Sequence, residues 1–250
     1  MSENELVQTG TPEQYKFLKE FVQGINGWLI DYTAIRTMDL LEWQRQLPCH
    51  GPLLEIGVFA GRYFSILARA SEEFGDRLIG IDTFQWIGEQ TVRDNIASLD
   101  HGQIRLIKKA SRELTAKDLL VELAAPARFI SVDGSHEADD VLHDLELAEE
   151  LISDCGIIAA DDFLNPLTLG VNEAINKFFL KPRRVTSFAY IANKLFLCLP
   201  ALAQELRDFV EGAARNDKIE PRSEGFRAQA AEGRHYVETN MWGQKFLLIP

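Results

Sequence analysis

Residues 127–163 read ARFISVDGSHEADDVLHDLELAEELISDCGIIAADDF and contain one complete strand–helix–strand unit. Residues 127–132 and 156–160 are nearly continuous apolar runs, which is typical of strands that are covered on both faces. Between them, residues 138–152 place apolar side chains on one helical face and acids on the other. Because a helical crossover brings the chain back in its original direction, this unit predicts a parallel sheet.

The same alternation continues on both sides of this unit. Earlier apolar runs lie at residues 52–58, 77–82 and 103–108, and an amphipathic stretch follows each of them. Later, two apolar runs at residues 183–190 and 194–200 are separated by only three residues, so they must pair antiparallel. The pattern predicts an α/β fold with a seven-stranded, Rossmann-like sheet, parallel except for one antiparallel strand in a terminal hairpin, and with helices on both faces.

Both ends of the chain lie outside this alternation. Residues 12–47 have helical spacing of apolar side chains, with a break between Gly24 and Gly27. Residues 201–214 predict one more helix, and a final apolar run at residues 245–250 has no assigned place. We therefore expect an N-terminal helical cap over residues 1–50, a sheet domain over 51–199, and an extension of the same globular unit over 200–250.

The composition restricts the class of protein. With 46% hydrophobic residues, 250 residues can bury a full core. The formal charge of −12 argues against binding to nucleic acid. We expect no membrane attachment, because no apolar stretch approaches the roughly 20 residues of a span, and the N-terminal residues lack the pattern of a signal peptide. A cytoplasmic protein with three reduced cysteines, Cys49, Cys155 and Cys198, is predicted.

Functional side chains are expected where the apolar runs end, because open parallel sheets bind ligands at the carboxyl ends of their strands. Three of the five runs end in acids, and a glutamate lies within the first. The segments at these ends are Glu55–Gly61, Asp82–Phe84, Ala110–Ser111, Asp133–His136 and Asp161–Phe163.

The first of these segments, EIGVFAG, predicts a strand-to-helix turn that lets a ligand approach the backbone. Its glycines, Gly57 and Gly61, have GxxxG spacing and not the GxGxxG spacing of dinucleotide-binding turns. Glu55 falls at a buried position and needs a partner, which is either a cationic ligand or a salt bridge within the loop. Asp82 ends the next strand, where an acid accepts hydrogen bonds from ribose hydroxyls or caps a helix.

These motifs, taken together, resemble the class I S-adenosylmethionine-dependent methyltransferases. EIGVFAG, IDTF, the stretch VDGSHEADD to ADDF, and GVNEAINKFF are similar to the small O-methyltransferases that act on sugars and natural products, a group that includes macrocin O-methyltransferase. The resemblance covers about residues 51–199. The residues that it implies for binding S-adenosylmethionine are Glu55, Gly57, Phe59, Gly61, Asp82, Thr83, Ser111 and Asp133.

The resemblance also assigns parts of the cofactor to parts of the chain. It implies that the turn at residues 55–61 holds the methionine part, that Asp82 holds the ribose, and that Ser111 lies near the adenine. Two departures stand out. Phe59 and Ala60 occupy positions where related enzymes often have glycine, and the usual acid beside the adenine is absent at Ala110–Ser111.

An acid cluster is expected where the fourth and fifth strands end. Asp133, Asp161 and Asp162 come from neighbouring tips, and three close carboxylates repel one another unless a cation neutralises them. Oxygen ligands suit Mg²⁺ or Mn²⁺. Metal-dependent catechol methyltransferases have a similar arrangement, which implies these three acids as metal ligands and His136, beside Asp133, as the catalytic base. The alternatives are a simple turn at Asp133 and a hydrogen-bonded loop histidine at His136.

The predicted function is S-adenosylmethionine-dependent O-methylation, assisted by Mg²⁺, of a hydroxyl on a sugar or natural product. One alternative is an NAD-dependent oxidoreductase on the same general fold. Another is a methyltransferase-like domain that binds without turnover. The expected partner is a small-molecule acceptor, and association into a homo-oligomer is expected from related enzymes. The sequence does not identify the acceptor.

Overall fold

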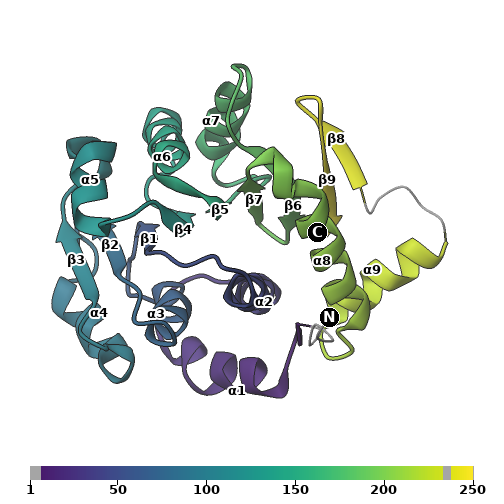
Figure 1. The fold of residues 1–250 in the computed structure, drawn as a ribbon, viewed down its shortest axis with the longest axis horizontal. Helices are drawn as coiled ribbons and strands as arrows, with labels where there is room; N and C mark the ends of the chain where they lie inside the picture. The colour runs from purple at the N-terminus through teal and green to yellow at the C-terminus, as the bar shows by residue number, and fades with distance from the viewer. Residues whose placement is uncertain (1–6, 233–237, 250) are drawn as a thin grey trace.

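The computed structural model describes residues 7–232 and 238–249. These residues form a nine-stranded sheet with the strand order β3-β2-β1-β4-β5-β7-β6-β9-β8 (Figure 1). The parallel strands are β1 (Leu53–Ile56), β2 (Leu78–Asp82), β3 (Ile104–Lys108), β4 (Ala127–Val132) and β5 (Ile152–Ala160). The α/β fold and the parallel sheet predicted from the sequence are confirmed.

The predicted hairpin closes the parallel half of the sheet. β6 (Thr186–Ile191) and β7 (Lys194–Cys198) pair antiparallel, and β7 inserts between β5 and β6. Because β7 runs opposite to β5, its second residue, Leu195, pairs with Ala160, the last residue of β5. The turn between β6 and β7 therefore lies at the same edge as the predicted site.

The predicted number of seven strands is wrong. The C-terminal extension adds β8 (Glu238–Met241) and β9 (Gln244–Ile249), and β9 pairs parallel with β6. An uncovered β6 would present a row of unpaired backbone groups along its outer edge. The apolar run at residues 245–249, which the sequence pattern could not place, lies in β9 and pairs with this edge of β6.

Helices cover both faces of the sheet (Figure 1). The helices α5 (Ala116–Leu123), α6 (Ala138–Leu151) and α7 (Leu169–Phe179) lie on one face. The other face carries α1 (Pro12–Glu20), α2 (Asp31–Gln46), α3 (Phe64–Glu72) and α8 (Ala203–Asn216). Side chains alternate along a strand, so Leu53 packs in the core on the α2 side and Leu54 in the core on the α6 side.

The remaining elements are short or peripheral. They are α4 (Glu89–Ile96), α9 (Pro221–Ala231) and the 3₁₀ turns Val22–Gly24, Ala97–Leu99, Ser111–Glu113 and Pro200–Leu202. Among the described helices, none has the length and apolarity that crossing a membrane requires.

A buried ion cluster joins the N-terminal helices to the segment between α8 and α9. The Arg36 guanidinium on α2 lies 3.1 Å from Asp39 and 2.8 Å from Asp217. Asp39 also accepts hydrogen bonds from the Gly10 amide and the Gln14 side chain, at 2.9 and 3.0 Å. Burial raises the pKa of Asp39 to about 6, against the attraction of Arg36. The cluster fixes residues that are far apart in the sequence to one position beside the sheet.

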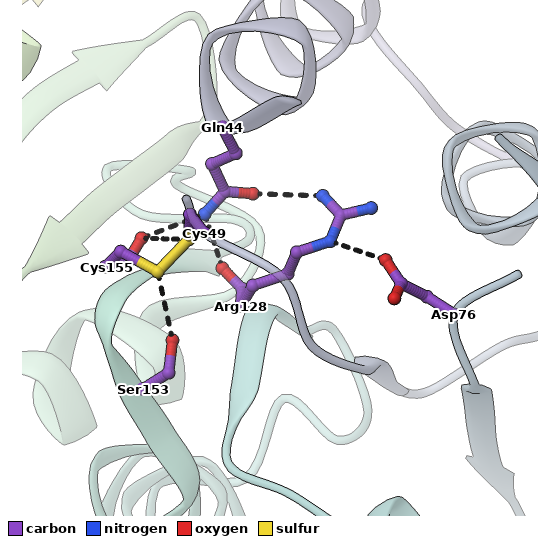
Figure 2. The surroundings of a disulfide bond; sticks show 6 residues. All are labelled: Gln44, Cys49, Asp76, Arg128, Ser153 and Cys155. Atoms are coloured by element: carbon purple, nitrogen blue, oxygen red, sulfur yellow. Dashed lines mark hydrogen bonds and ion pairs between the residues drawn. A yellow bond between two sulfur atoms is a disulfide. The ribbon is translucent and has the colours of Figure 1, made fainter. Parts of the chain in front are cut away.

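The prediction of three reduced cysteines is wrong. Cys49, which follows α2, forms a disulfide with Cys155 in β5 across 106 residues of sequence, and their Cα atoms lie 5.9 Å apart (Figure 2). Cys198 is free and buried. Figure 2 also shows the Gln44 amide donating to the carbonyls of Arg128 and Cys155, at 2.6 and 3.1 Å. The end of α2 is thus held to the start of β4 and β5.

Candidate active site

The carboxyl ends of the parallel strands meet at one edge through backbone hydrogen bonds. The Gly57 amide donates to the Ile81 carbonyl, and the Asp133 amide donates to the Ile56 carbonyl, each at 2.8 Å. The Asp161 amide donates to the Val132 carbonyl at 3.0 Å. The tips of β2, β1, β4 and β5 are therefore directly adjacent, as the strand-end argument requires.

The turn at residues 55–61 packs tightly against the tip of β4. A Cβ atom on Gly57 would lie 2.0 Å from the Asp133 carbonyl oxygen, and Gly57 has a φ of +88°. Glycine is thus needed here because another backbone approaches it closely. Phe59 adopts a φ of 49°, in the left-handed region, at a position where related enzymes often have glycine.

Asp82 holds this turn in place. Its Oδ2 accepts hydrogen bonds from the Val58 and Phe59 amides at 2.9 and 2.8 Å, and its Oδ1 accepts one from the Phe84 amide at 2.6 Å. The helix-cap alternative is wrong, because α4 has Gly88 as its N-cap. A carboxylate has about four acceptor positions, so one remains for a ligand hydroxyl.

The predicted cofactor residues form a partly exposed strip along this edge. Gly57, Phe59, Asp82, Thr83, Ser111 and Asp133 are all half-buried, whereas Glu55 and Gly61 are buried. The strip crosses the tips of four neighbouring strands, which suits an extended nucleoside ligand. Acidic side chains along it also suit the positive charge of a sulfonium. The residues present therefore fit S-adenosylmethionine.

Glu55 lies beneath this strip and is almost completely enclosed, with 1% of its surface exposed. Burial raises its pKa well above the usual range, and the negative charges of Asp161 and Asp82 add to this effect while Lys194 opposes it. Its Oε2 has no hydrogen-bond partner among the described residues. The positive charge that acts on Glu55 comes from within the protein, from Lys194, and not from the turn.

His136 forms a hydrogen-bonded pair with Asp162. The His136 Nε2 lies 3.1 Å from Asp162 Oδ2, and the side chain of His136 is 54% exposed. This hydrogen bond, together with the charges of Asp162 and Asp161, raises the pKa of His136 against the effect of its partial burial. The same hydrogen bond lowers the pKa of Asp162. Asp162 has a φ of 58°, in the left-handed region that residues other than glycine rarely adopt.

Asp133 lies beside this pair. Potential ligand atoms of Asp133, His136 and Asp162 all lie within 4.8 Å of one another. Burial raises the pKa of Asp133 well above its usual range, and the charge of Asp161 raises it further. Two carboxylates and an imidazole this close fit a divalent cation with open positions for oxygen ligands.

Asp161 points to a different set of partners. Its Oδ2 lies 2.9 Å from the Lys194 ammonium, and its Oδ1 accepts a hydrogen bond of 2.6 Å from the side-chain amide of Asn193. The sequence placed all four side chains in one cluster, whereas the compact group in the structure contains Asp133, His136 and Asp162, and Asp161 contacts Lys194 and Asn193.

Lys194 is the residue of this cluster that the sequence pattern did not predict. It is the first residue of β7, its side chain is 1% exposed, and its ammonium lies 4.4 Å from the centre of the Tyr63 ring. Burial lowers its pKa, but the charges of Asp161 and Asp133 outweigh this effect and raise it. The available signal was a lysine that opens the otherwise apolar strand KLFLC.

Comparison with protein families assigns the class. Residues 54–163 match the family model described as a methyltransferase domain. This segment contains the turn, Asp82 and the acids after β4 and β5. Residues 54–163 therefore match a methyltransferase domain, which is the class that the sequence motifs predicted. A search of curated proteins found no match.

Several solved structures share the fold. The TDP-rhamnose 3'-O-methyltransferase CalS11 of calicheamicin biosynthesis is 19% identical, with a TM-score of 0.53 over 75% of this chain and 87% of that chain. The O-methyltransferase NovP is 15% identical, with a TM-score of 0.55 over 67% and 82%. MycE of mycinamycin biosynthesis, solved with Mg, S-adenosylhomocysteine and mycinamycin VI, is 15% identical, with a TM-score of 0.53 over 76% and 54%.

Proposed function

We propose that the protein methylates a hydroxyl group on a sugar or a natural product. The observation that carries this proposal is the pairing of His136 with Asp162 at the edge that also carries the cofactor strip. When bound, S-adenosylmethionine supplies the methyl group and leaves as S-adenosylhomocysteine. The names of CalS11 and MycE support an acceptor of this kind.

The proposed role of His136 is that of general base. Its half-exposed imidazole can receive the proton of an acceptor hydroxyl while the hydroxyl oxygen forms its bond to the methyl carbon. Asp162 orients the imidazole through Nε2 and stabilises its protonated form. Histidine suits this task because its pKa lies close to neutral pH.

Asp133 and Asp162 would hold a Mg²⁺ or Mn²⁺ ion, which would orient the acceptor hydroxyl and make it more acidic. Their carboxylate oxygens lie within 4.8 Å of each other and of His136, and the backbone of Asp133 packs against Gly57. If His136 acts as the base, two carboxylates remain for the ion, and water or acceptor oxygens complete its coordination.

The rim beside His136 favours an acceptor with an apolar body. The loop between β5 and α7 exposes Leu164 and Leu167, of which Leu167 is 90% exposed, and Leu169 at the start of α7 is exposed as well. The start of α7 touches the histidine loop, because a Cβ on Gly170 would lie 2.2 Å from the His136 carbonyl oxygen. A hydroxyl on a large, partly apolar scaffold could reach His136 while its scaffold covers these leucines.

Two alternatives make different predictions. A nicotinamide-dependent oxidoreductase would bind NAD, but the glycine turn lacks the GxGxxG spacing and packs against Asp133. A binding domain without turnover would bind S-adenosylhomocysteine but transfer no methyl group.

Thermal melting of the full chain with each ligand separates these functions. We expect saturating S-adenosylhomocysteine to raise the melting temperature and NAD to leave it unchanged. Incubation with methyl-labelled S-adenosylmethionine and a panel of sugar and natural-product alcohols should then label an acceptor oxygen. Stabilisation by NAD alone, or cofactor binding without labelling of any acceptor, would favour one of the alternatives.

A further inference from the structure

Lys194 places an ammonium group inside the acid cluster. Its ammonium lies 2.9 Å from Asp161 Oδ2 and 3.9 Å from Asp133 Oδ2. The side chain is enclosed, and the Tyr63 ring covers the ammonium at 4.4 Å. Tyr63 is itself held by a hydrogen bond of 3.0 Å between its hydroxyl and that of Thr37. The lysine therefore has little freedom to leave the cluster.

Asn193, the residue before Lys194, also holds the Asp161 side chain in place. The side-chain amide of Asn193 donates a hydrogen bond to Asp161 Oδ1 at 2.6 Å, and the Thr33 hydroxyl lies 3.3 Å from Asn193 Oδ1. Asp161 Oδ1 thus accepts a hydrogen bond from Asn193, and Asp161 Oδ2 forms an ion pair with Lys194. An ion that used Asp161 as a ligand would lie close to the Lys194 ammonium, and the two positive charges would repel each other.

The same ammonium opposes an ion at Asp133. Like charges in a partly buried site repel strongly, because the surroundings screen them less than bulk water does. Asp133 is shared between the ammonium on one side and the group formed with His136 and Asp162 on the other. Lys194 thus acts on two of the three carboxylates that the sequence implied as metal ligands.

We propose that Lys194 is a positioning residue that keeps Asp161 out of the metal coordination and weakens the binding of divalent cations at Asp133 and Asp162. The inference rests on the cation site of the proposed function. It assigns the carboxylates two different tasks: Asp162 and Asp133 face the ion and the acceptor, whereas Asp161 anchors the lysine.

Titration of the full chain with Mn²⁺, followed by electron paramagnetic resonance of the free ion, tests the proposal without any methyl transfer. We expect Lys194→Gln to lower the Kd for Mn²⁺ at least about tenfold, since it removes a positive charge beside Asp133. Lys177→Gln is the matched control, because it removes the same charge from an exposed pair with Glu173. Its Kd should stay within about twofold of the wild-type value, as expected for a screened surface charge. An unchanged or weaker affinity in Lys194→Gln would overturn the proposal.

A second pair of variants keeps the test decisive if Lys194→Gln does not fold. Asp162→Asn should weaken Mn²⁺ binding at least about tenfold more than Asp161→Asn, because Asp162 is a ligand and Asp161 is not. Equal losses would identify Asp161 as a ligand and overturn the proposal. Melting with S-adenosylhomocysteine is measured on the same samples. If the wild type is stabilised, a failed Mn²⁺ result contradicts the role of Lys194 alone, whereas no stabilisation contradicts the methyltransferase assignment.

Discussion

His136 and Asp162 are the two side chains whose protonation decides whether a base is available. The neutral imidazole accepts a proton, and Asp162 favours the charged imidazole through its hydrogen bond and its negative charge. The pKa of His136 therefore lies above the ordinary value of about 6.5. Without a divalent cation bound, the neutral fraction of the imidazole should rise with pH at a pH above that ordinary value.

Asp162→Asn should move this rise to lower pH. The substitution removes the charge that stabilises the imidazolium, so the pKa of His136 falls and the neutral form dominates at lower pH. Nuclear magnetic resonance titration of the His136 ring measures the shift directly and does not depend on metal or turnover. An imidazole that titrates at the same pH in both proteins would contradict the pairing.

His136→Gln should lower kcat by about 10²–10⁴-fold, which is the usual contribution of a general base. The stabilisation by S-adenosylhomocysteine should persist, because the histidine loop lies outside the turn that Asp82 holds. The matched control is His50→Gln. His50 lies exposed before β1 and packs against the Phe74 ring, so kcat should change less than about threefold. Equal losses in the two variants would exclude a specific role for His136.

Among the secondary-structure elements, the turn after β1 sets the geometry of the site because it leaves no space at Gly57. Gly57→Ala would place a methyl group 2.0 Å from the Asp133 carbonyl oxygen at a positive φ. We expect the free energy of unfolding to fall by about 3 kcal/mol or more, since overpacking and backbone strain both contribute. Urea denaturation measures this change.

Gly24→Ala provides the control for this turn. A Cβ on Gly24 would meet no heavy atom within 4 Å, and its φ is not in the left-handed region. Its effect on the free energy of unfolding should stay within about 1 kcal/mol. If Gly57→Ala were equally mild, the close packing of the turn against β4 would be incorrect.

Helix α2 contributes a buried charge that the rest of the fold must neutralise. Arg36→Met would leave Asp39 and Asp217 buried without their cation, and we expect a loss of about 3–5 kcal/mol in the free energy of unfolding. Arg45→Met, on the same helix, removes an exposed pair with Glu42 and should cost at most about 1 kcal/mol. Urea denaturation of both variants compares them, and similar losses would show that the buried cluster is not structurally important.

At the scale of the whole molecule, the disulfide between Cys49 and Cys155 connects the helical N-terminal part to the centre of the sheet. It closes a loop of 106 residues, so breaking it increases the conformational freedom of the unfolded chain. We expect a reducing agent to lower the free energy of unfolding by about 2–4 kcal/mol and the melting temperature by about 5–10 °C.

The double variant Cys49→Ser, Cys155→Ser is the control for reduction. It should melt at the temperature of the reduced wild type, with or without a reducing agent, because Cys198 is buried and remains a thiol. Calorimetry measures both proteins. A wild type that melts at the same temperature under both conditions would contradict the predicted stabilisation.

The sequence by itself determined the alternation of strands and helices, and with it the edge where functional side chains gather. Apolar runs and amphipathic stretches report burial residue by residue, so the parallel sheet, the hairpin and the acids Asp133, Asp161 and Asp162 were predictable. The GxxxG turn and Asp82 were also located correctly at this edge, and the match of residues 54–163 to a methyltransferase domain agrees with the class inferred from them.

The tertiary structure decided which of these side chains meet. The antiparallel direction of β7 brings Lys194 and Asn193 to Asp161, whereas Asp162 pairs with His136. The disulfide and the strands β8 and β9 also depend on segments far apart in the chain. Local patterns carry no information on such distances, because ion pairs, sulfur bonds and edge pairing form only between surfaces that the completed fold brings together.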